Sequence, residues 1–255
     1  MEKTQFDDIR PYNAEEIPAA MVRIANSSSF PLLASYVYPD EPLEIAFGAN
    51  LMINQLVIDI GKCNKMFKVE RPGNNIKDFY RSSRHLSDYI RYVITEKGES
   101  AWIAQRNGRT KDGNDVTDQG IIKMFCMSCA EDKINAIDDL HIVPIAVSYE
   151  WEPCDVLKTL ELYESQFSKY TKKPGEDLNS ILTGIVQEKG RVHFELCEPL
   201  SYAELSKFDG LTNNDYHKQV ARLIDRRIRA AYRLYPNNYI AYDLRYGTTK
   251  YKHCY

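Results

Sequence analysis

Short apolar segments of strand-like character alternate with longer amphipathic segments along this chain, and the alternation restricts the fold more than any other feature. The strand-like segments are residues 43–47, 65–70, 101–104, 142–149 and 191–197, and helical patterns occupy residues 13–25, 76–97, 117–125, 155–169 and 214–234. Strands that alternate with helices favour a layered domain built on a parallel sheet. We therefore predict an α/β fold in which a mainly parallel central sheet is flanked by helices.

The alternation is interrupted neither by an internal repeat nor by a linker, so residues 43–255 are predicted to form one α/β domain. Residues 1–42 precede it as an N-terminal helical segment. In that segment Asn13 and Glu16 have the three-residue spacing of a capping box, which predicts a short helix through about Ala25.

Three of the predicted strands carry specific expectations about burial. Residues 142–149 are apolar on both faces, as in a central strand of a covered sheet, with Pro144 at its start or at an irregularity. Residues 101–104 are predicted to be a buried strand. In residues 191–197, Val192, Phe194 and Leu196 alternate with polar residues, which predicts one apolar face and places His193 on the polar one.

Charge and composition exclude several classes of protein. The 255 residues carry a formal net charge of −3, which gives no electrostatic reason to expect a nucleic-acid partner. The longest uncharged stretches are shorter than the roughly 20 apolar residues of a membrane span, and the first residues lack the pattern of a secretory signal. We therefore expect a cytoplasmic protein with six reduced cysteines, of which the pair Cys126 and Cys129 is interpreted as core packing.

The segment that follows the predicted strand 101–104 is the first candidate for a ligand site, because ligands gather at the carboxyl ends of parallel strands. It contains three cations, Arg106, Arg109 and Lys111, together with Gly108, within six residues. Cationic side chains and a close backbone approach are what binding of a phosphate monoester requires. The alternative is a basic loop that is merely solvated.

A second candidate is the pair His85 and Asp88 on the long predicted helix. Residues three apart on a helix are neighbours, so the carboxylate is placed to orient the imidazole as a general base. The alternative is an exposed helical pair without a catalytic role. The arginines of the last long helix, Arg226, Arg227, Arg229 and Arg233, either approach anionic lipid headgroups or solvate one helix face.

Several segments resemble the glycerol-phosphate acyltransferase (PlsC-like) family, specifically a bacterial branch of it. Residues 64–71 are similar to the second sequence block of that family, residues 102–113 to the third, and residues 142–150 to the fourth. The closing stretch, residues 223–243, is also similar to that branch. The resemblance covers most of the chain from about residue 43 onward, with the blocks in the family's order.

The resemblance implies transfer of an acyl group from acyl-CoA or an acyl-carrier protein to a glycerol phosphate-type acceptor in glycerolipid synthesis. No bound cofactor is implied, and the chain would act at the cytoplasmic face of the inner membrane, where peripheral contact is expected. Arg71, Gly108 and Arg109 match family positions that hold the acceptor phosphate, and Arg106, Asn107 and Lys111 lie beside them.

Two departures from the family pattern concern catalysis. The family's base is a histidine and an aspartate separated by four residues, and none of the five histidines here is followed by an aspartate at that spacing. Asn107 stands where the family block has a glutamate. The alternative hypothesis is therefore a non-catalytic phosphate- or lipid-binding paralogue. A sheet without the family segment that precedes Leu43 is expected to leave an edge or an apolar face uncovered.

Overall fold

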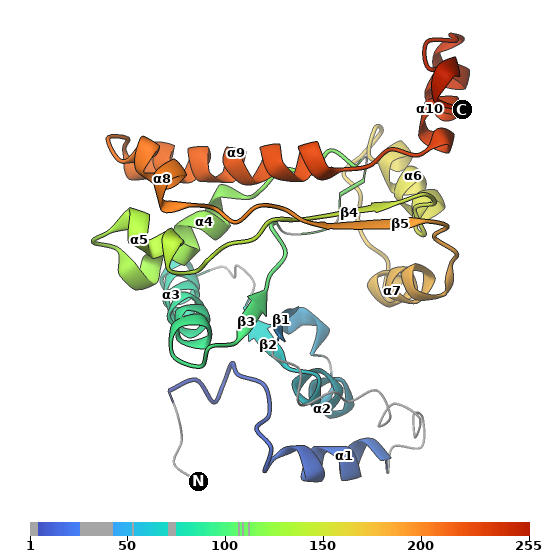
Figure 1. The fold of residues 1–255 in the computed structure, drawn as a ribbon. Helices are drawn as coiled ribbons and strands as arrows, with labels where there is room; N and C mark the ends of the chain where they lie inside the picture. Colours follow the sequence, from blue (N-terminus) through green and yellow to red (C-terminus); the bar gives the residue numbers. More distant parts are fainter. Residues whose placement is uncertain are drawn as a thin grey trace. The chain divides into compact units, whose positions relative to one another are not determined.

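The computed structural model describes residues 5–25, 43–52, 54–70, 75–106, 108, 110–111 and 113–255. The described helices and strands follow one another in the order α1 (Ile17–Ala25), β1 (Leu43–Gly48), α2 (Gln55–Cys63), β2 (Met66–Val69), α3 (Ile76–Thr95), β3 (Ser100–Trp102), α4 (Gln119–Phe125), α5 (Lys133–Asp138), β4 (Ile145–Tyr149), α6 (Asp155–Glu164), α7 (Glu176–Val186), β5 (Val192–Leu196), α8 (Tyr202–Leu205), α9 (Asn213–Ala231) and α10 (Pro236–Tyr246) (Figure 1). The α/β class predicted from the alternation is confirmed.

The chain forms two compact units. Unit 1 contains Met1–Asn107, Asp118–Ile142 and Ser201–Val220, and unit 2 contains Gly108–Thr117, Val143–Leu200 and Ala221–Tyr255. This division differs from the boundary expected at residue 42, because the N-terminal segment belongs to the same unit as the first three strands.

Unit 1 is built on a three-stranded parallel sheet with the order β2-β1-β3. Ile45 is in register with Met66 on one side and with Trp102 on the other. Each helix that connects two of these strands begins with an asparagine cap: Asn54 accepts a hydrogen bond from the Val57 amide, and Asn75 accepts one from the Lys77 amide. The helices thus return the chain so that the three strands run in one direction.

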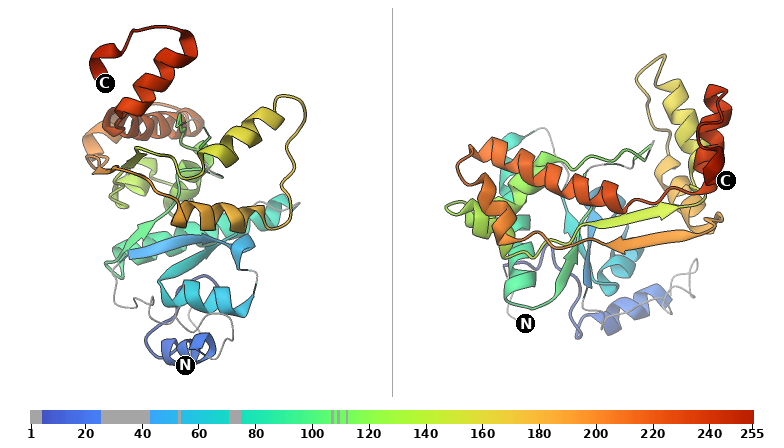
Figure 2. Two further views of the ribbon diagram at one scale, coloured as in Figure 1. Left: turned by 90° about the vertical axis from the view of Figure 1, so that its right-hand side faces the viewer. Right: turned by 45° about the horizontal axis from the view of Figure 1, so that its top comes forward.

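The core of unit 1 lies between α3, the sheet and the short helices that follow. Its fully buried side chains include Phe67, Tyr89, Val93, Ile122, Ile137 and Leu205. Helix α1 packs beside α2 (Figure 2), and Arg23 of α1 forms an ion pair of 2.6 Å with the buried Asp59 of α2. The capping box predicted at the start of α1 is confirmed by reciprocal hydrogen bonds between Asn13 and Glu16.

Unit 2 contains the antiparallel pair β4 and β5, in which Val147 is in register with Phe194. The C-terminal end of α9 is bound to this pair, because the Arg233 amide donates to Ser148 Oγ at 2.9 Å and His193 Nε2 lies 3.1 Å from the Ala231 carbonyl oxygen. Helix α10 is followed by a C-terminal turn, which is held to it because the buried Asp243 of α10 accepts hydrogen bonds from Thr248 Oγ1 and the Tyr251 amide.

Two expectations about strands are wrong. Residues 142–149 were expected to form a central strand of a covered sheet, whereas β4 pairs antiparallel with β5 in a two-stranded sheet of the described residues. Residues 101–104 were expected to be a buried strand, whereas Trp102 is 51% exposed. Both errors have one cause: apolar composition reports the tendency to be buried, but not the neighbours that would bury a strand.

Candidate functional site

Strands β2 and β3 lie on either side of β1 and run parallel to it, so their carboxyl ends lie at the same end of the sheet of unit 1. Arg71 follows the last residue of β2 by two positions, and Arg106 follows the last residue of β3 by four. Arg71, Asn107 and Arg109 themselves lie outside the described residues. Of the predicted phosphate-binding residues, the structure therefore describes Arg106, Gly108 and Lys111, and Arg106 is half-buried.

Gly108 is exposed and adopts a φ of +75°, a left-handed conformation that favours glycine. Apart from its chain neighbours, no atom of the described residues lies within 4 Å of the position that a Cβ would occupy there, so the backbone conformation, and not a steric limit, favours glycine.

Lys111 is already paired within unit 2. Its Nζ forms a close ion pair with Glu161 Oε2 of α6, and both side chains are about one-fifth exposed. The same loop is anchored further on, where Thr117 donates from both its amide and its hydroxyl to the buried Asp225, at 2.8 and 2.7 Å. A phosphate bound by Lys111 would have to compete with the Glu161 carboxylate for this ammonium group.

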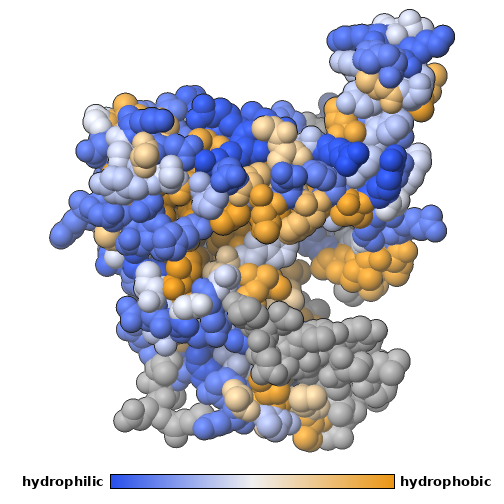
Figure 3. Space-filling view, in the orientation of Figure 1, coloured by the Kyte–Doolittle hydropathy of each residue, from blue (hydrophilic) through white to orange (hydrophobic). Residues whose placement is uncertain are grey.

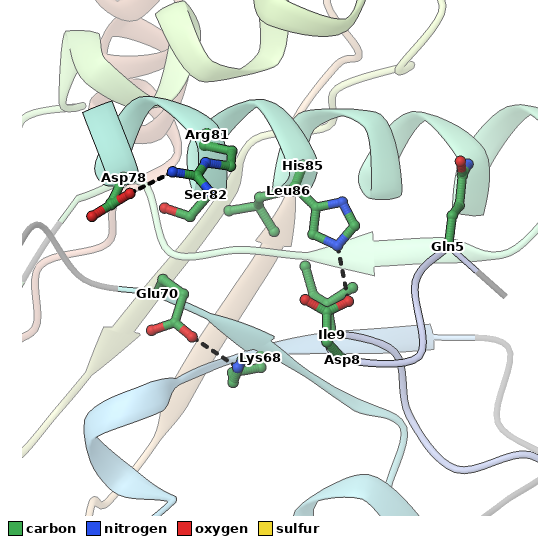
Figure 4. A pocket seen from close by; sticks show the side chains of 10 residues that line it. All are labelled: Gln5, Asp8, Ile9, Lys68, Glu70, Asp78, Arg81, Ser82, His85 and Leu86. Atoms are coloured by element: carbon green, nitrogen blue, oxygen red, sulfur yellow. Dashed lines mark hydrogen bonds and ion pairs between the residues drawn. The ribbon is translucent and has the colours of Figure 1, made fainter. Parts of the chain in front are cut away.

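A pocket of about 470 Å³ in unit 1 contains the predicted residue His85 (Figure 4). Three cationic or titratable side chains point into it, and each meets an acid: Lys68 lies 2.8 Å from Glu70, Arg81 lies 2.6 Å from Asp78, and His85 lies 3.0 Å from Asp8. Lys68 and Glu70 come from the carboxyl-terminal end of β2 and the residue after it. The pocket therefore lies at the end of the strand that leads to Arg71.

His85 is paired with Asp8, and not with Asp88 as the helical spacing suggested. Asp88 instead accepts a hydrogen bond of 3.3 Å from Arg84, its neighbour one turn earlier on α3. Asp8 is brought to His85 by the N-terminal segment, in which Phe6 is buried and its ring centre lies 5.4 Å from that of His85. The same segment is tied to β2 by a hydrogen bond from the Lys68 amide to the Ile9 carbonyl oxygen.

The His85–Asp8 pair has the composition of a general base with an orienting carboxylate. With Nε2 of the ring facing Asp8 Oδ1, the other ring nitrogen, Nδ1, is left to accept a proton. The imidazole is 32% exposed and the Asp8 carboxylate 64%, so water competes for both groups and the pair contributes little to stability.

A buried network beside this site was not predicted from the sequence. The carboxylate of Glu44, in the middle of unit 1, accepts hydrogen bonds from Tyr89 Oη and from Lys97 Nζ, and Glu99 links Lys97 to Lys65. Burial, together with the adjacent Glu44 carboxylate, raises the pKa of Tyr89. For Lys97, burial alone would lower the pKa, but the hydrogen bond to Glu44 raises it overall.

The network lines a second cleft of about 730 Å³, in which Arg10 and Glu16 of the N-terminal segment also lie 2.7 Å apart. Arg10, Lys65 and Lys97 each face an acid, so these described cations are not free to receive an anionic ligand. The signal in the sequence was the single carboxylate of Glu44 inside the otherwise apolar strand 43–47, which pointed to a buried partner but not to its identity.

Of the two cysteines predicted to pack in the core, Cys126 is buried, whereas Cys129 is only half-buried. Desolvation raises the pKa of Cys126 to about 12, which makes it an unreactive thiol. No group of three or more His, Cys, Asp or Glu side chains among the described residues is arranged to hold a metal ion. None of the described helices has both the length and the apolar character that crossing a membrane requires.

Comparison with known proteins adds no identification: no family model, curated protein or solved structure matches this chain.

Proposed function

We propose that this chain transfers an acyl group from acyl-CoA or an acyl-carrier protein to the hydroxyl group of a glycerol phosphate-type acceptor, in glycerolipid synthesis at the cytoplasmic face of the membrane. The observation that carries the proposal is the resemblance of residues 64–71, 102–113 and 142–150, in this order, to three blocks of the glycerol-phosphate acyltransferase family.

The sheet of unit 1 supports an acceptor site for a phosphate. Because β2 and β3 are parallel and flank β1, the segments that leave their carboxyl ends start about two strand spacings, or roughly 10 Å, apart. Arg71 and Arg106 follow these two strands. A pair of guanidinium groups from two such segments suits a dianionic phosphate monoester, which accepts several charge-assisted hydrogen bonds.

Acyl transfer also needs a base, and His85 is the candidate in the pocket at the end of β2. In the reaction, the acceptor hydroxyl oxygen attacks the thioester carbonyl while Nδ1 of His85 accepts its proton. The thiolate then leaves and takes up a proton, so that an ester and a free thiol are formed. Asp8 would orient the imidazole and stabilise its protonated form, because it lies 3.0 Å from Nε2.

The test is an acyl-transfer assay on the purified chain, with acyl-CoA or acyl-carrier protein as donor and glycerol 3-phosphate or its monoacyl ester as acceptor. The lipid product is measured by mass spectrometry. We expect turnover that falls by a factor of about 100 or more in His85→Gln and in Arg106→Ala. Lys218→Ala is the matched control, because Lys218 is an exposed cation of the same unit whose partner, Asp215, is 3.5 Å away.

A second candidate function is non-catalytic binding of a phosphate or lipid ligand by a regulatory paralogue. It is favoured by a specific observation: the sequence has no histidine followed by an aspartate at the family spacing. Calorimetric titration with glycerol 3-phosphate distinguishes the two. The second function would be established, and the first excluded, by two results together. The chain would bind glycerol 3-phosphate in a way that Arg106→Ala abolishes, and it would show no turnover with any pair of donor and acceptor.

A further inference from the structure

Strand β5 has one edge that no described strand covers. In the described sheet it pairs with β4 alone. The Arg191 carbonyl oxygen accepts from the Glu150 amide at 2.8 Å, and the Cys197 amide donates to the Pro144 carbonyl oxygen at 2.9 Å. Since backbone groups of a strand alternate in direction, the odd-numbered residues of β5 bond to β4, and the N–H and C=O groups of Val192, Phe194 and Leu196 face the open edge.

The side chains of these same three residues are also exposed. Val192 is 50%, Phe194 60% and Leu196 65% exposed. Proteins usually protect an open edge with charged side chains, above all lysine, with a proline or with a bulge. Val192–Leu196 has one charged residue, Glu195, contains neither lysine nor proline, and pairs with β4 in continuous register. Hydrophobic side chains gather along β5 and over α7 in Figure 3, where Ile185 and Val186 are 68% and 73% exposed.

We propose that β5 is a self-association edge, which pairs antiparallel with β5 of a second copy of this chain about a two-fold axis at Phe194. The product is a continuous four-stranded sheet with the order β4-β5-β5-β4. An axis at the central residue of the strand overlaps all five residues of both copies. It also places the outward-facing backbone groups of Val192, Phe194 and Leu196 opposite one another, as a hydrogen-bonded antiparallel ladder requires.

The side chains are complementary in this register. Phe194 faces Phe194 of the second copy, and Val192 faces Leu196, so apolar residues meet on one face of the sheet. On the other face His193 lies opposite Glu195 of the second copy. Each His193 ring already lies 3.4 Å from Glu195 of its own strand, so the register sets a histidine, and not a second carboxylate, against each Glu195. Cross-strand pairs of these kinds stabilise an antiparallel sheet.

The exposed area is adequate for a dimer. The three β5 side chains and Ile181, Leu182, Ile185 and Val186 of α7 are between 44% and 73% exposed. At roughly 100 Å² each, which is below the 150–250 Å² that an aromatic side chain buries, they present about 700 Å² per copy. A standard protein interface buries about 800 Å² per partner, and the paired backbone supplies the remainder.

Charge favours a second copy over a lipid surface as the occupant. Residues 151–197, which contain α6, α7 and β5, carry eight acidic and six basic side chains. An excess of negative charge is repelled by the anionic headgroups that attract peripheral proteins. A second copy carries the same small excess, but the symmetric register keeps the acidic side chains of β5 apart, because each Glu195 lies opposite His193 and not opposite another carboxylate.

The oligomeric state of the full chain tests the proposal. Light scattering after gel filtration, over a series of concentrations, should show a dimer whose dissociation constant rises at least tenfold in Phe194→Glu, because two carboxylates would then face each other at the axis. Leu244→Glu is the matched control, since Leu244 is 77% exposed on α10 of the same unit. A monomer at every concentration, or an equal effect of both variants, would overturn the proposal, as would flotation of a monomer with phosphatidylglycerol vesicles.

The register is tested by the variant Phe194→Cys. Opposed residues of a hydrogen-bonded antiparallel pair have Cα atoms about 5.5 Å apart, a separation that a disulfide spans. Oxidised glutathione serves as the oxidant. The two introduced thiols at position 194, one from each copy, are expected to form one disulfide, while one molecule of oxidised glutathione is reduced to two molecules of glutathione. The wild-type chain, with its six native cysteines, is the control. A dimer that is not cross-linked through position 194 would refute this register.

Discussion

The ion pair between Glu44 and Lys97 leads to an asymmetric prediction about stability. The Glu44 side chain has no exposed surface, whereas that of Lys97 is 29% exposed, and the two charged atoms lie 2.5 Å apart. Lys97 also lies 3.3 Å from Glu99, whereas Glu44 has Tyr89 as its other described donor. Removal of either partner therefore leaves a different group behind.

Lys97→Met leaves a buried carboxylate with one neutral donor. Breaking a buried ion pair in this way costs about 3–5 kcal/mol, and we expect about 3 kcal/mol because Tyr89 still donates to the carboxylate. Glu44→Gln leaves an ammonium group that reaches water and Glu99, while the new amide oxygen still accepts from Tyr89. The expected cost of that variant is about 1 kcal/mol.

The free energies of unfolding are measured by urea denaturation. Of the two tryptophans, Trp102 lies in unit 1 and Trp151 in unit 2, so a Trp151→Phe background makes the fluorescence report unit 1. Lys218→Met serves as the control, with an expected cost below about 1 kcal/mol for an exposed pair. If Glu44→Gln destabilises unit 1 as much as Lys97→Met does, the argument from unequal burial is refuted.

Three further predictions concern single residues. The hydroxyl of the fully buried Tyr216 has no hydrogen-bond partner among the described residues, so Tyr216→Phe should raise the free energy of unfolding by about 1 kcal/mol. A lower free energy of unfolding for this variant in urea denaturation would contradict the prediction. Burial lowers the pKa of His217 below its ordinary 6.5, so the neutral imidazole stabilises the fold above pH 6.5, and this contribution is lost as the pH falls through the pKa of the folded state. His217→Gln should therefore lower the free energy of unfolding less at pH 5 than at pH 7.5. An equal loss at both pH values would refute the burial of a neutral His217. Gly190 has a φ of +59°, and a Cβ there would lie 2.8 Å from Trp151 Cδ1. Gly190→Ala should therefore lower the free energy of unfolding of unit 2 by about 2 kcal/mol or more, measured by thermal denaturation. An unchanged melting temperature of unit 2 would contradict this.

Elements with local signals were predictable. The capping box at Asn13 and Glu16, the helical period through α3 and its stop at Gly98, and the existence of three short strands in unit 1 all follow from residues within a few positions of one another. Helix α2 was missed, because Gly61 and several β-branched residues weaken its intrinsic preference. It is held by tertiary contacts, including the hydrogen bond from Tyr12 to Asp59.

The candidate site was predictable in its parts but not in its pairings. His85 was singled out from the sequence, but its partner Asp8 is 77 residues away, and Asp88 is paired with Arg84 instead. Lys111 was predicted as a phosphate ligand, whereas it pairs with Glu161, 50 residues further along the chain. Neither partner has a signal near the residue that it binds.

The sequence by itself thus determined the α/β class, the three strands and the long helix α3 of unit 1, and the chemistry that its side chains offer, because these depend on periodicity, capping and residue type. Only the tertiary structure decided which strand pairs with which, which charge faces which, and which apolar face is left open. Those outcomes depend on contacts between residues far apart in the chain, as when β4 pairs with β5 and leaves the outer edge of β5 exposed.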